Sequence, residues 1–280
     1  MGTLDGKVAV ISGAARGQGR SHALRLAGEG ADIIALDICR DIATMDYPNA
    51  TPADLATTVD EVKALGRRIV ASQTDVRDVH AVRAAVDAGV AELGRLDIVL
   101  PQAGIVRYAK SDDLIGDAEA WTDILNVNLT GYYHLIEVCI PHLVAGGRGG
   151  VIVMTGSVAA TRPVGATGAS VAYMAAKHGV VGMMKVYALS LAKHGIRVNV
   201  VHPTGVVSGM TMNAAMEKIA AEAAAGTARE DNWVARSKNL LDVQILQPED
   251  ISNAVAFLVS DQAKWVTGEE IKVDAGFSLL

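Results

Sequence analysis

The sequence predicts an α/β protein with a doubly wound Rossmann fold, in which a mostly parallel seven-stranded sheet is flanked by helices. Three observations support this prediction. Short β-branched runs alternate with longer amphipathic stretches, which supply the crossover helices that a parallel sheet requires. Runs such as Val8–Ile11 and Val151–Met154 are apolar throughout, as expected of strands covered on both faces. A glycine-rich turn follows the first run, at the kind of strand end where doubly wound folds bind ligands.

The predicted elements follow one another in the order that this fold requires. The short apolar or β-branched runs predict strands at Lys7–Ser12, Asp32–Asp37, Arg68–Thr74, Asp97–Leu100, Gly150–Met154, Arg197–Val201 and Glu270–Val273. Apolar residues recur at three- and four-residue spacing in the clearest predicted helices, Val79–Leu93, Trp121–Leu143 and Tyr173–His194. The chain has 280 residues, of which 50% are hydrophobic, so it is long enough to bury one large core. We predict a single domain over residues 1–280.

Two segments are longer than a minimal α/β unit needs, and each follows the carboxyl end of a predicted strand. Residues 39–54 contain a Tyr-Pro and a Thr-Pro pair, which favour turns and a helix start. Residues 206–241 are rich in Ala and Met. Open α/β sheets bind ligands at this edge, so we expect the first segment to cover a cofactor and the second to form a substrate lid. The alternative is that either segment is only a surface insertion.

Composition and charge argue against several classes of function. The formal net charge is −6 and no Lys/Arg cluster offsets it, so we expect no nucleic-acid partner. Cys39 and Cys139 have no metal-ligand spacing, so we expect no metal site, and thiols that stay reduced in the cytosol. The sequence lacks a signal-peptide pattern and any apolar run of about 18 residues free of charge and glycine. We therefore expect a cytoplasmic protein without a membrane span.

The glycine-rich turn indicates a dinucleotide site. Gly13 permits a sharp turn after the first strand, while Gly17 and Gly19 let the backbone and the next helix approach a pyrophosphate. Such turns also serve packing alone, so the evidence rests on context. Here the turn lies between a predicted strand and a helix, and Asp37 follows eighteen positions beyond Gly19, at the end of the second strand.

The charges near Asp37 decide which dinucleotide is expected. A carboxylate there accepts the ribose hydroxyls of adenosine and repels a 2′-phosphate, which favours NAD over NADP. Arg16 and Arg40 argue for NADP, because a guanidinium in this region can pair with a 2′-phosphate. We give the carboxylate more weight and predict NAD.

Tyr173 and Lys177 are the residues that most directly indicate catalysis. At four-residue spacing on a helix, the phenol and the ammonium share one face, so the positive charge stabilises phenolate and lowers the tyrosine pKa. Such a tyrosine serves as acid or base toward an alcohol or a carbonyl. Ser157 lies between this pair and the glycine turn. The alternative is a surface helix pair with a turn-capping serine.

These motifs resemble those of the short-chain dehydrogenase/reductase family over essentially the whole chain. The spacing of Gly13, Gly17 and Gly19 is similar to that family's Thr-Gly-x-x-x-Gly-x-Gly, with Ser12 in the place of Thr. The other segments that resemble family motifs are Asp75-Val76, Pro101-Gln102-Ala103-Gly104, Asn126-Val127-Asn128-Leu129, Tyr173-Met174-Ala175-Ala176-Lys177 and His202-Pro203-Thr204-Gly205-Val206.

The resemblance implies a catalytic tetrad of Asn128, Ser157, Tyr173 and Lys177. In the family, the tyrosine exchanges the hydroxyl proton and the serine hydrogen-bonds the substrate oxygen. The lysine lowers the tyrosine pKa and holds the nicotinamide ribose, and the asparagine supports a water-linked proton path. For Asn128, capping or kinking its helix is the alternative. The residues expected to bind cofactor are Gly13, Arg16, Gly17, Gln18, Gly19, Asp37, Ile38, Asp75, Val76, Gln102, Ala103, Gly104, Tyr173, Lys177, Pro203, Thr204, Gly205, Val206 and Ser208.

The chain departs from the family pattern in two places. Pro101 and Gln102 replace two asparagines, which puts the usual side-chain bracing of the central strands in doubt. Tyr173 lies sixteen positions after Ser157, a few more than the family commonly has. The segment Pro163–Gly168 is placed to absorb the excess as a loop.

Residues 39–54, with their Tyr-Pro and Thr-Pro-x-Asp-Leu elements, and the run Asp75-Val76-Arg77-Asp78 resemble the actinobacterial subgroup described as mycofactocin-coupled or carveol-dehydrogenase-like. This narrower resemblance implies NAD held too tightly to exchange, a peptide-derived redox carrier, and secondary alcohols such as terpenols as substrates. A loop over the adenosine half is a physical reason for slow NAD release. The family resemblance also implies a homo-oligomer, and we expect a tetramer.

We therefore predict an NAD-dependent enzyme that interconverts a small hydrophobic secondary alcohol and its ketone. The alternative of the same class is an NADP-dependent carbonyl or 3-oxoacyl reductase, which Arg16 supports. The alternative of another class is a non-catalytic, nucleotide-sensing Rossmann protein. Replacing Tyr173 with Phe separates these classes, because a sensor keeps its function whereas a dehydrogenase loses turnover.

Overall fold

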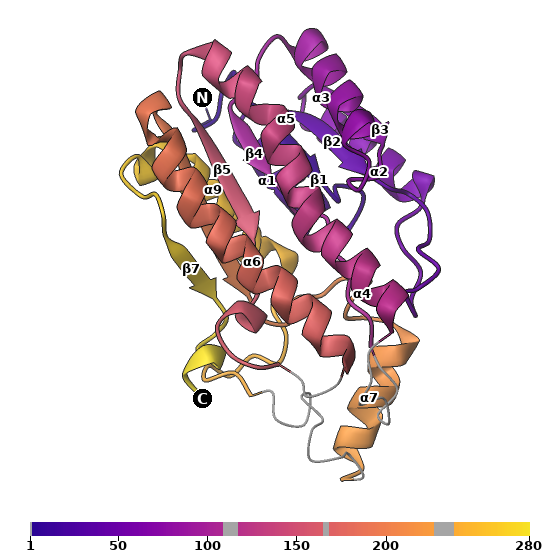
Figure 1. Cartoon of the computed structure of the whole chain (residues 1–280). Helices are drawn as coiled ribbons and strands as arrows, with labels where there is room; N and C mark the ends of the chain where they lie inside the picture. The colour runs from indigo at the N-terminus through magenta and orange to yellow at the C-terminus, as the bar shows by residue number, and fades with distance from the viewer. Residues whose placement is uncertain (1, 109–116, 165–167, 227–237) are drawn as a thin grey trace.

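A parallel sheet of seven strands forms the centre of the protein (Figure 1). The computed structural model describes residues 2–108, 117–164, 168–226 and 238–280. The strands are β1 Val8–Ser12, β2 Asp32–Asp37, β3 Ile69–Gln73, β4 Ile98–Leu100, β5 Gly150–Thr155, β6 Ile196–Pro203 and β7 Glu270–Val273. In space their order is β3, β2, β1, β4, β5, β6 and β7. Every neighbouring pair is parallel, so the sheet that was predicted to be mostly parallel is parallel throughout its described strands.

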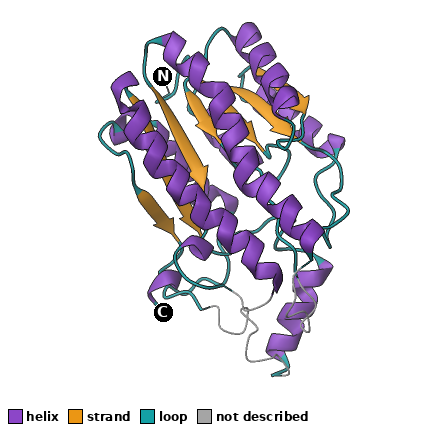
Figure 2. Ribbon diagram, viewed as in Figure 1, coloured by secondary structure: helices purple, strands orange, loops and turns teal. Residues whose placement is uncertain are grey.

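Helices cover both faces of the sheet (Figure 2). They are α1 Gly17–Gly28, α2 Pro52–Ala64, α3 Val79–Leu93, α4 Ala118–Leu125, α5 Gly131–Gly146, α6 Gly168–Leu191, α7 Ala214–Ala224 and α9 Pro248–Val259. Alternate residues of a strand point to opposite faces, so Ile33 joins an apolar cluster with α1 and α9 while Ile34 joins another with α3, α5 and α6. None of the described helices is both long and apolar enough to span a membrane.

The predicted elements are observed, with differences in two of the helices and small shifts at the ends of the strands. The helix predicted at Tyr173–His194 begins five residues earlier, as α6 Gly168–Leu191, and its last three residues form a 3₁₀ turn. The helix predicted at Trp121–Leu143 is α4 and α5 joined by a π-turn, η1 Asn126–Thr130. In this turn the Gly131 N–H bonds to the Asn126 carbonyl, five residues back. A π-turn changes the hydrogen-bond step without removing the apolar spacing, so the sequence pattern gave no sign of it. β6 also runs two residues beyond its predicted end, to Pro203.

The order of the strands places a ligand-binding crevice at one edge of the sheet. The chain runs outward from β1 to β3 and then returns to β4 on the other side of β1. In open α/β sheets, ligands bind outside the carboxyl ends of the strands at such a reversal. Both long segments lie after these ends. Residues 39–54 lead from β2 into α2, whose start is fixed by a capping box between Thr51 and Asp54. The segment at residues 206–241 contains α7, and its residues 227–237 lie outside the described part of the chain.

Candidate active site

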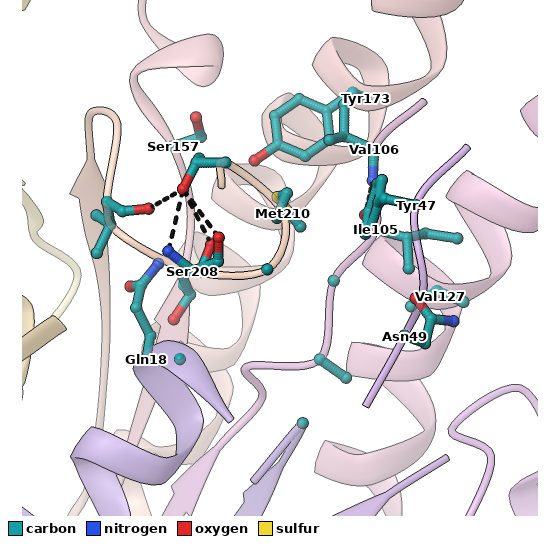
Figure 3. A pocket seen from close by; sticks show the side chains of 18 of the residues that line it. Gln18, Tyr47, Asn49, Ile105, Val106, Val127, Ser157, Tyr173, Ser208 and Met210 are labelled. Atoms are coloured by element: carbon teal, nitrogen blue, oxygen red, sulfur yellow. Dashed lines mark hydrogen bonds between the residues drawn. The ribbon is translucent and has the colours of Figure 1, made fainter. Parts of the chain in front are cut away.

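A cavity of about 620 Å³ lies at the carboxyl ends of the strands. Its lining comes from segments that are far apart in sequence: the turn after β1, residues 39–54, the loops after β4, β5 and β6, and the helices α6 and α7. Figure 3 shows side chains from several of these segments around a common space. This volume is in the range of sites for small molecules and cofactors.

Glycine shapes the turn between β1 and α1. Gly13 has φ +68°, and a Cβ at this position would lie 2.8 Å from the Ala103 Cα atom. A Cβ at Gly19 would lie 2.0 Å from the Gly13 carbonyl oxygen. Helix α1 begins at Gly17, and the first N–H groups of a helix have no partner within the helix. The turn therefore presents backbone donors to the cavity without side chains in the way, which suits a pyrophosphate.

Gln18 provides an independent test of whether this turn fits a dinucleotide. Its side chain lines the cavity (Figure 3). The Oε1 atom is buried and has no hydrogen-bond partner among the described residues. A buried acceptor without a donor is costly, so a ligand that donates a hydrogen bond here would stabilise the protein. The open turn and the unpartnered acceptor both fit a bound nucleotide.

The acidic residue predicted to bind ribose, Asp37, lines the cavity. Asp37 is 6% exposed at the end of β2, and its Oδ2 accepts a hydrogen bond from the Ala15 N–H at 3.0 Å. Its Oδ1 accepts from the Cys39 N–H at 3.1 Å. These bonds fix the carboxylate; the Cys39 Sγ is a second, weaker donor to Oδ1 at 3.8 Å, and Oδ2 keeps a second lone pair for a ligand hydroxyl. Asp75 and Val76, after β3, line the same part of the cavity.

The two arginines that argued for NADP both have partners within the protein. Arg16 donates from Nη2 to the Pro48 carbonyl at 2.7 Å. Arg40 Nη2 lies 3.1 Å from Asp75 Oδ2. The Arg16 guanidinium also fills the space beside Gly209, where a Cβ would lie 2.5 Å from its Nη1 atom. Arg16 therefore lies between residues 39–54 on one side and the start of the predicted lid on the other.

Ser157 and Tyr173 form the reactive pair of the site. Ser157 follows β5, and its Oγ accepts a hydrogen bond from the Ala159 N–H at 3.1 Å. Its hydroxyl is also hydrogen-bonded to the Tyr173 phenol (Figure 3 shows both side chains). Burial raises the pKa of Tyr173, and the bond with Ser157 acts in the opposite direction. The sequence predicted a lowered pKa, but burial has the larger effect because it disfavours the charged phenolate.

Lys177 lies one helical turn from Tyr173 and is 3% exposed. Its Nζ donates to the Thr155 carbonyl at 2.7 Å and to the Tyr132 hydroxyl at 3.4 Å. The Nζ atom is 5.6 Å from the centroid of the Tyr173 ring. Burial lowers the pKa of Lys177 to about 7. A lysine that titrates near neutral pH is suited to exchange a proton, and in its protonated form it stabilises a nearby phenolate.

Asn128 does not line the cavity, in contrast to Ser157, Tyr173 and Lys177. It lies in the π-turn with no solvent exposure. Its Oδ1 accepts from the Ile105 N–H at 2.8 Å, and its Nδ2 donates to the Ile105 carbonyl at 2.8 Å. These two bonds hold the loop after β4, so the described role of the Asn128 side chain is to brace the cavity wall.

The loop after β6 also lines the cavity, and its Ser208 and Gly209 lie beside Gly17 and Arg16 of the glycine turn. Val206 pairs with Leu246, and the Leu246 N–H donates to the Gly205 carbonyl at 2.9 Å. Ser208 donates from its backbone N–H to Thr211 Oγ1 at 3.1 Å. All the predicted site residues other than Asn128 line the cavity, namely Gly13, Arg16, Gly17, Gln18, Gly19, Asp37, Ile38, Asp75, Val76, Gln102, Ala103, Gly104, Ser157, Tyr173, Lys177, Pro203, Thr204, Gly205, Val206 and Ser208.

Known proteins share this arrangement over the full length of the chain. The family model described as enoyl-(acyl carrier protein) reductase matches residues 13–278. The chain is 43% identical over 280 residues to (−)-trans-carveol dehydrogenase of Rhodococcus erythropolis, covering 100% of both chains. The chain belongs to the short-chain dehydrogenase/reductase family.

Two solved structures extend this comparison. The fold is similar to the crystal structure of carveol dehydrogenase from Mycobacterium avium in complex with NAD, with a TM-score of 0.91 and 46% identity over 100% of both chains. It is also similar to a short chain dehydrogenase from Mycobacterium paratuberculosis bound to NAD, with a TM-score of 0.89 and 40% identity over 100% of both chains. The family and the resemblance to carveol dehydrogenases that the sequence predicted are therefore confirmed.

The departure at Gln102 from the short-chain dehydrogenase/reductase pattern is compensated within the structure. The Gln102 Oε1 accepts hydrogen bonds from the Thr155 hydroxyl and from His22 Nε2, the latter at 3.2 Å. Its backbone N–H donates to Ser12 Oγ at 3.1 Å. Gln102 thus connects the ends of β1, β4 and β5 with α1, and the strands are braced without the two asparagines.

Sequence reasoning missed several residues that support the site. Thr155 and Tyr132 hold Lys177, and Tyr47 lines the cavity from residues 39–54. His202 is buried with Nδ1 at 3.1 Å from the Ser157 backbone nitrogen and 2.8 Å from its carbonyl oxygen. Thr155 was predictable from its place at the carboxyl end of a strand. Tyr47 and His202 lie in segments that the motifs marked, but their contacts, like those of Tyr132, come from tertiary packing that no local pattern predicts.

Proposed function

We propose that this protein is an NAD-dependent dehydrogenase that interconverts hydrophobic secondary alcohols and ketones. The observation that carries the proposal is the presence in one cavity of the Ser157–Tyr173 hydrogen bond, the buried Lys177 and the glycine turn that leads to Asp37. The relatives named as carveol dehydrogenases, one of them in complex with NAD, support both the cofactor and a terpenol-like substrate.

Tyr173 is the acid or base of the proposed reaction. In the oxidation direction its phenolate accepts the hydroxyl proton of the alcohol, and in reduction its phenol donates a proton to the carbonyl oxygen. The Ser157 hydroxyl hydrogen-bonds the same oxygen and orients it toward Tyr173. Lys177, held by the Thr155 carbonyl, stabilises the phenolate by its positive charge. When bound, the nicotinamide accepts a hydride from the carbinol carbon or returns it.

Among the alternatives, the observed contacts of Arg16 and Arg40 favour NAD over NADP. Both guanidiniums are already paired, with the Pro48 carbonyl and with Asp75. A 2′-phosphate near Asp37 would therefore meet the repulsion of a carboxylate, and to bind it Arg40 would have to leave Asp75 or Arg16 would have to turn from the Pro48 carbonyl. The NADP-dependent carbonyl or 3-oxoacyl reductase is accordingly the weaker candidate.

We further propose that NAD is held tightly beneath residues 39–54 and that turnover depends on an external redox carrier. Arg16 and Thr44 each fasten this segment to the rest of the protein, through Pro48 and through Asp123. A cover that must open before NAD leaves slows its release. The cytoplasmic location and the homotetramer stay predictions that follow from the sequence.

The first experiment identifies the nucleotide. Purified protein is denatured and the released nucleotide is identified by mass spectrometry, and the native protein is assayed on carveol with added NAD or with an artificial electron acceptor. Released NAD, with turnover only when the acceptor is present, is the expected result. Protein without nucleotide that turns over freely with added NADP would contradict both the cofactor and the tight binding.

Replacing Tyr173 with Phe tests the chemistry. Removing a positioned acid or base lowers kcat by about 10²–10⁴-fold, so the Tyr173→Phe variant should lose that much activity while keeping its bound nucleotide. Tyr133→Phe is the matched control, because Tyr133 is 49% exposed and does not line the cavity. A nucleotide-sensing protein without catalysis would show no turnover in the unmodified chain.

A further inference from the structure

Tyr47 belongs to residues 39–54 and reaches the catalytic end of the cavity. Its side chain is 7% exposed and its hydroxyl accepts a hydrogen bond from the Val106 N–H at 3.1 Å. Val106 belongs to the loop after β4 and lines the cavity together with Tyr173, as Figure 3 shows. The segment predicted to cover the cofactor therefore also reaches the space beside the reactive tyrosine.

Tyr108 continues the same wall toward the lid. Its ring centroid lies 6.1 Å from that of Tyr47, at an interplanar angle of 48°, which is within the range of favourable aromatic packing. Its hydroxyl donates to the Met210 carbonyl at 2.6 Å. Tyr47, Tyr108 and Met210, from three segments of the chain, thus line one side of the cavity. We call the two tyrosine rings the aromatic wall.

The hydrogen bonds of the aromatic wall hold its rings in place. Both phenol groups bond to part-buried backbone atoms, so a ring that turns away loses a hydrogen bond; for Tyr47 this leaves the Val106 N–H without its partner, whereas the Met210 carbonyl also accepts from Asn213 Nδ2. Burial raises the pKa of Tyr47 and of Tyr108, so both stay neutral. The neighbouring Arg107 pairs with Asp117. A substrate at this wall meets fixed, uncharged aromatic rings.

We propose that Tyr47 and Tyr108 determine which alcohols the site accepts, so that residues 39–54 act as a specificity element as well as a cover for the cofactor. The ligand class is an uncharged cyclic alcohol whose hydrocarbon ring packs on the two phenol rings while its hydroxyl reaches Ser157 and Tyr173. This inference rests on the proposed function, because it concerns the substrate of the same site.

The experiment compares alcohols of increasing bulk. Dissociation constants of cyclohexanol, carveol and the bicyclic borneol are measured by calorimetry with NAD present, in a Tyr173→Phe background that blocks turnover. Tyr47→Ala and Tyr108→Ala should favour borneol relative to cyclohexanol by about tenfold, because truncating a ring opens space that only the larger ligand fills. Tyr47→Phe keeps the ring and should leave this ratio unchanged, which separates shape from the loss of one hydrogen bond.

Thr44→Ala is the matched control. Thr44 Oγ1 donates to Asp123 Oδ2 at 2.6 Å, and Thr44 fastens residues 39–54 without lining the cavity. This variant should speed NAD release while leaving the ratio of alcohol affinities as it is. Equal ratios in all variants, or no binding of any alcohol, would overturn the inference. Failure of the proposed function has a different signature, since the chain with Tyr173 intact would then turn over none of these alcohols.

Discussion

Replacing Asp37 with Asn tests the assignment of the nucleotide site most sharply. The Asp37 carboxylate accepts one backbone N–H on each oxygen, from Ala15 and from Cys39. An amide has only one acceptor oxygen, so its NH₂ group must face one of these N–H groups and leave it unpaired. An unpaired buried donor costs about 1–3 kcal/mol of folding free energy. For a chain of this size, each kcal/mol lowers the melting temperature by about 2–4 °C.

The same substitution should weaken NAD binding by about 10–150-fold. A hydrogen bond to a charged group contributes about 1.5–3 kcal/mol, and the ribose hydroxyls would lose their charged acceptor. Affinity for NADP should rise, because the negative charge that repels a 2′-phosphate is gone. Both affinities are measured by calorimetric titration of nucleotide-free protein, alongside a thermal melt.

Asp78→Asn is the control for this experiment. Asp78 caps α3 by accepting from the His80 and Ala81 N–H groups and does not line the cavity. Its substitution should lower stability without changing the preference between the two nucleotides. If Asp37→Asn loses stability but keeps NAD affinity and discrimination, then Asp37 is a structural residue of the turn and the reasoning about ribose fails.

Two further predictions concern the glycine turn and acid stability. Gly19→Ala should abolish nucleotide binding, because its Cβ would lie 2.0 Å from the Gly13 carbonyl oxygen. The control Gly28→Ala has open space around its Cβ and should bind the nucleotide normally in the same titration. Burial lowers the pKa of His22 from 6.5 to about 4, so the unfolded chain binds more protons between these values. Stability should therefore fall as the pH drops from about 6.5 to 4, by up to about 1.4 kcal/mol per pH unit. Urea titrations across this range should show a flatter profile for His22→Gln, and an unchanged slope would rule out this histidine as the cause.

The sequence was a good guide to the fold because burial on both faces leaves a strong signal. Strands such as β1 and β5 are apolar throughout and were placed to within one residue at each end. The π-turn at Asn126–Thr130 was not predictable, since its altered hydrogen-bond step leaves the apolar spacing of the helix intact.

The candidate site likewise has a part that the sequence predicts and a part that depends on tertiary packing. Residues in contiguous motifs, such as Gly13 and Tyr173, were found because their spacing reflects local geometry. The side chain of Asn128 was expected in the reaction, and that role stays a prediction; its bonds to Ile105 depend on the packing of two distant segments and could not be predicted from the sequence. Tyr47 was assigned to a cofactor cover, and its place beside Tyr108 likewise depends on tertiary contacts.

The contact between Arg16 and Gly209 bears on how enzymes with this architecture change substrates during evolution. The first residues of the predicted lid follow β6 closely, and a side chain at position 209 would displace the Arg16 guanidinium, which also bonds to the Pro48 carbonyl. A lineage adapting to a new alcohol should therefore vary Met212, which is 60% exposed, more readily than Gly209, because a change at Gly209 also disturbs the contact between Arg16 and Pro48. Selection for new substrates should leave more divergence in the residues after this glycine than at the glycine itself.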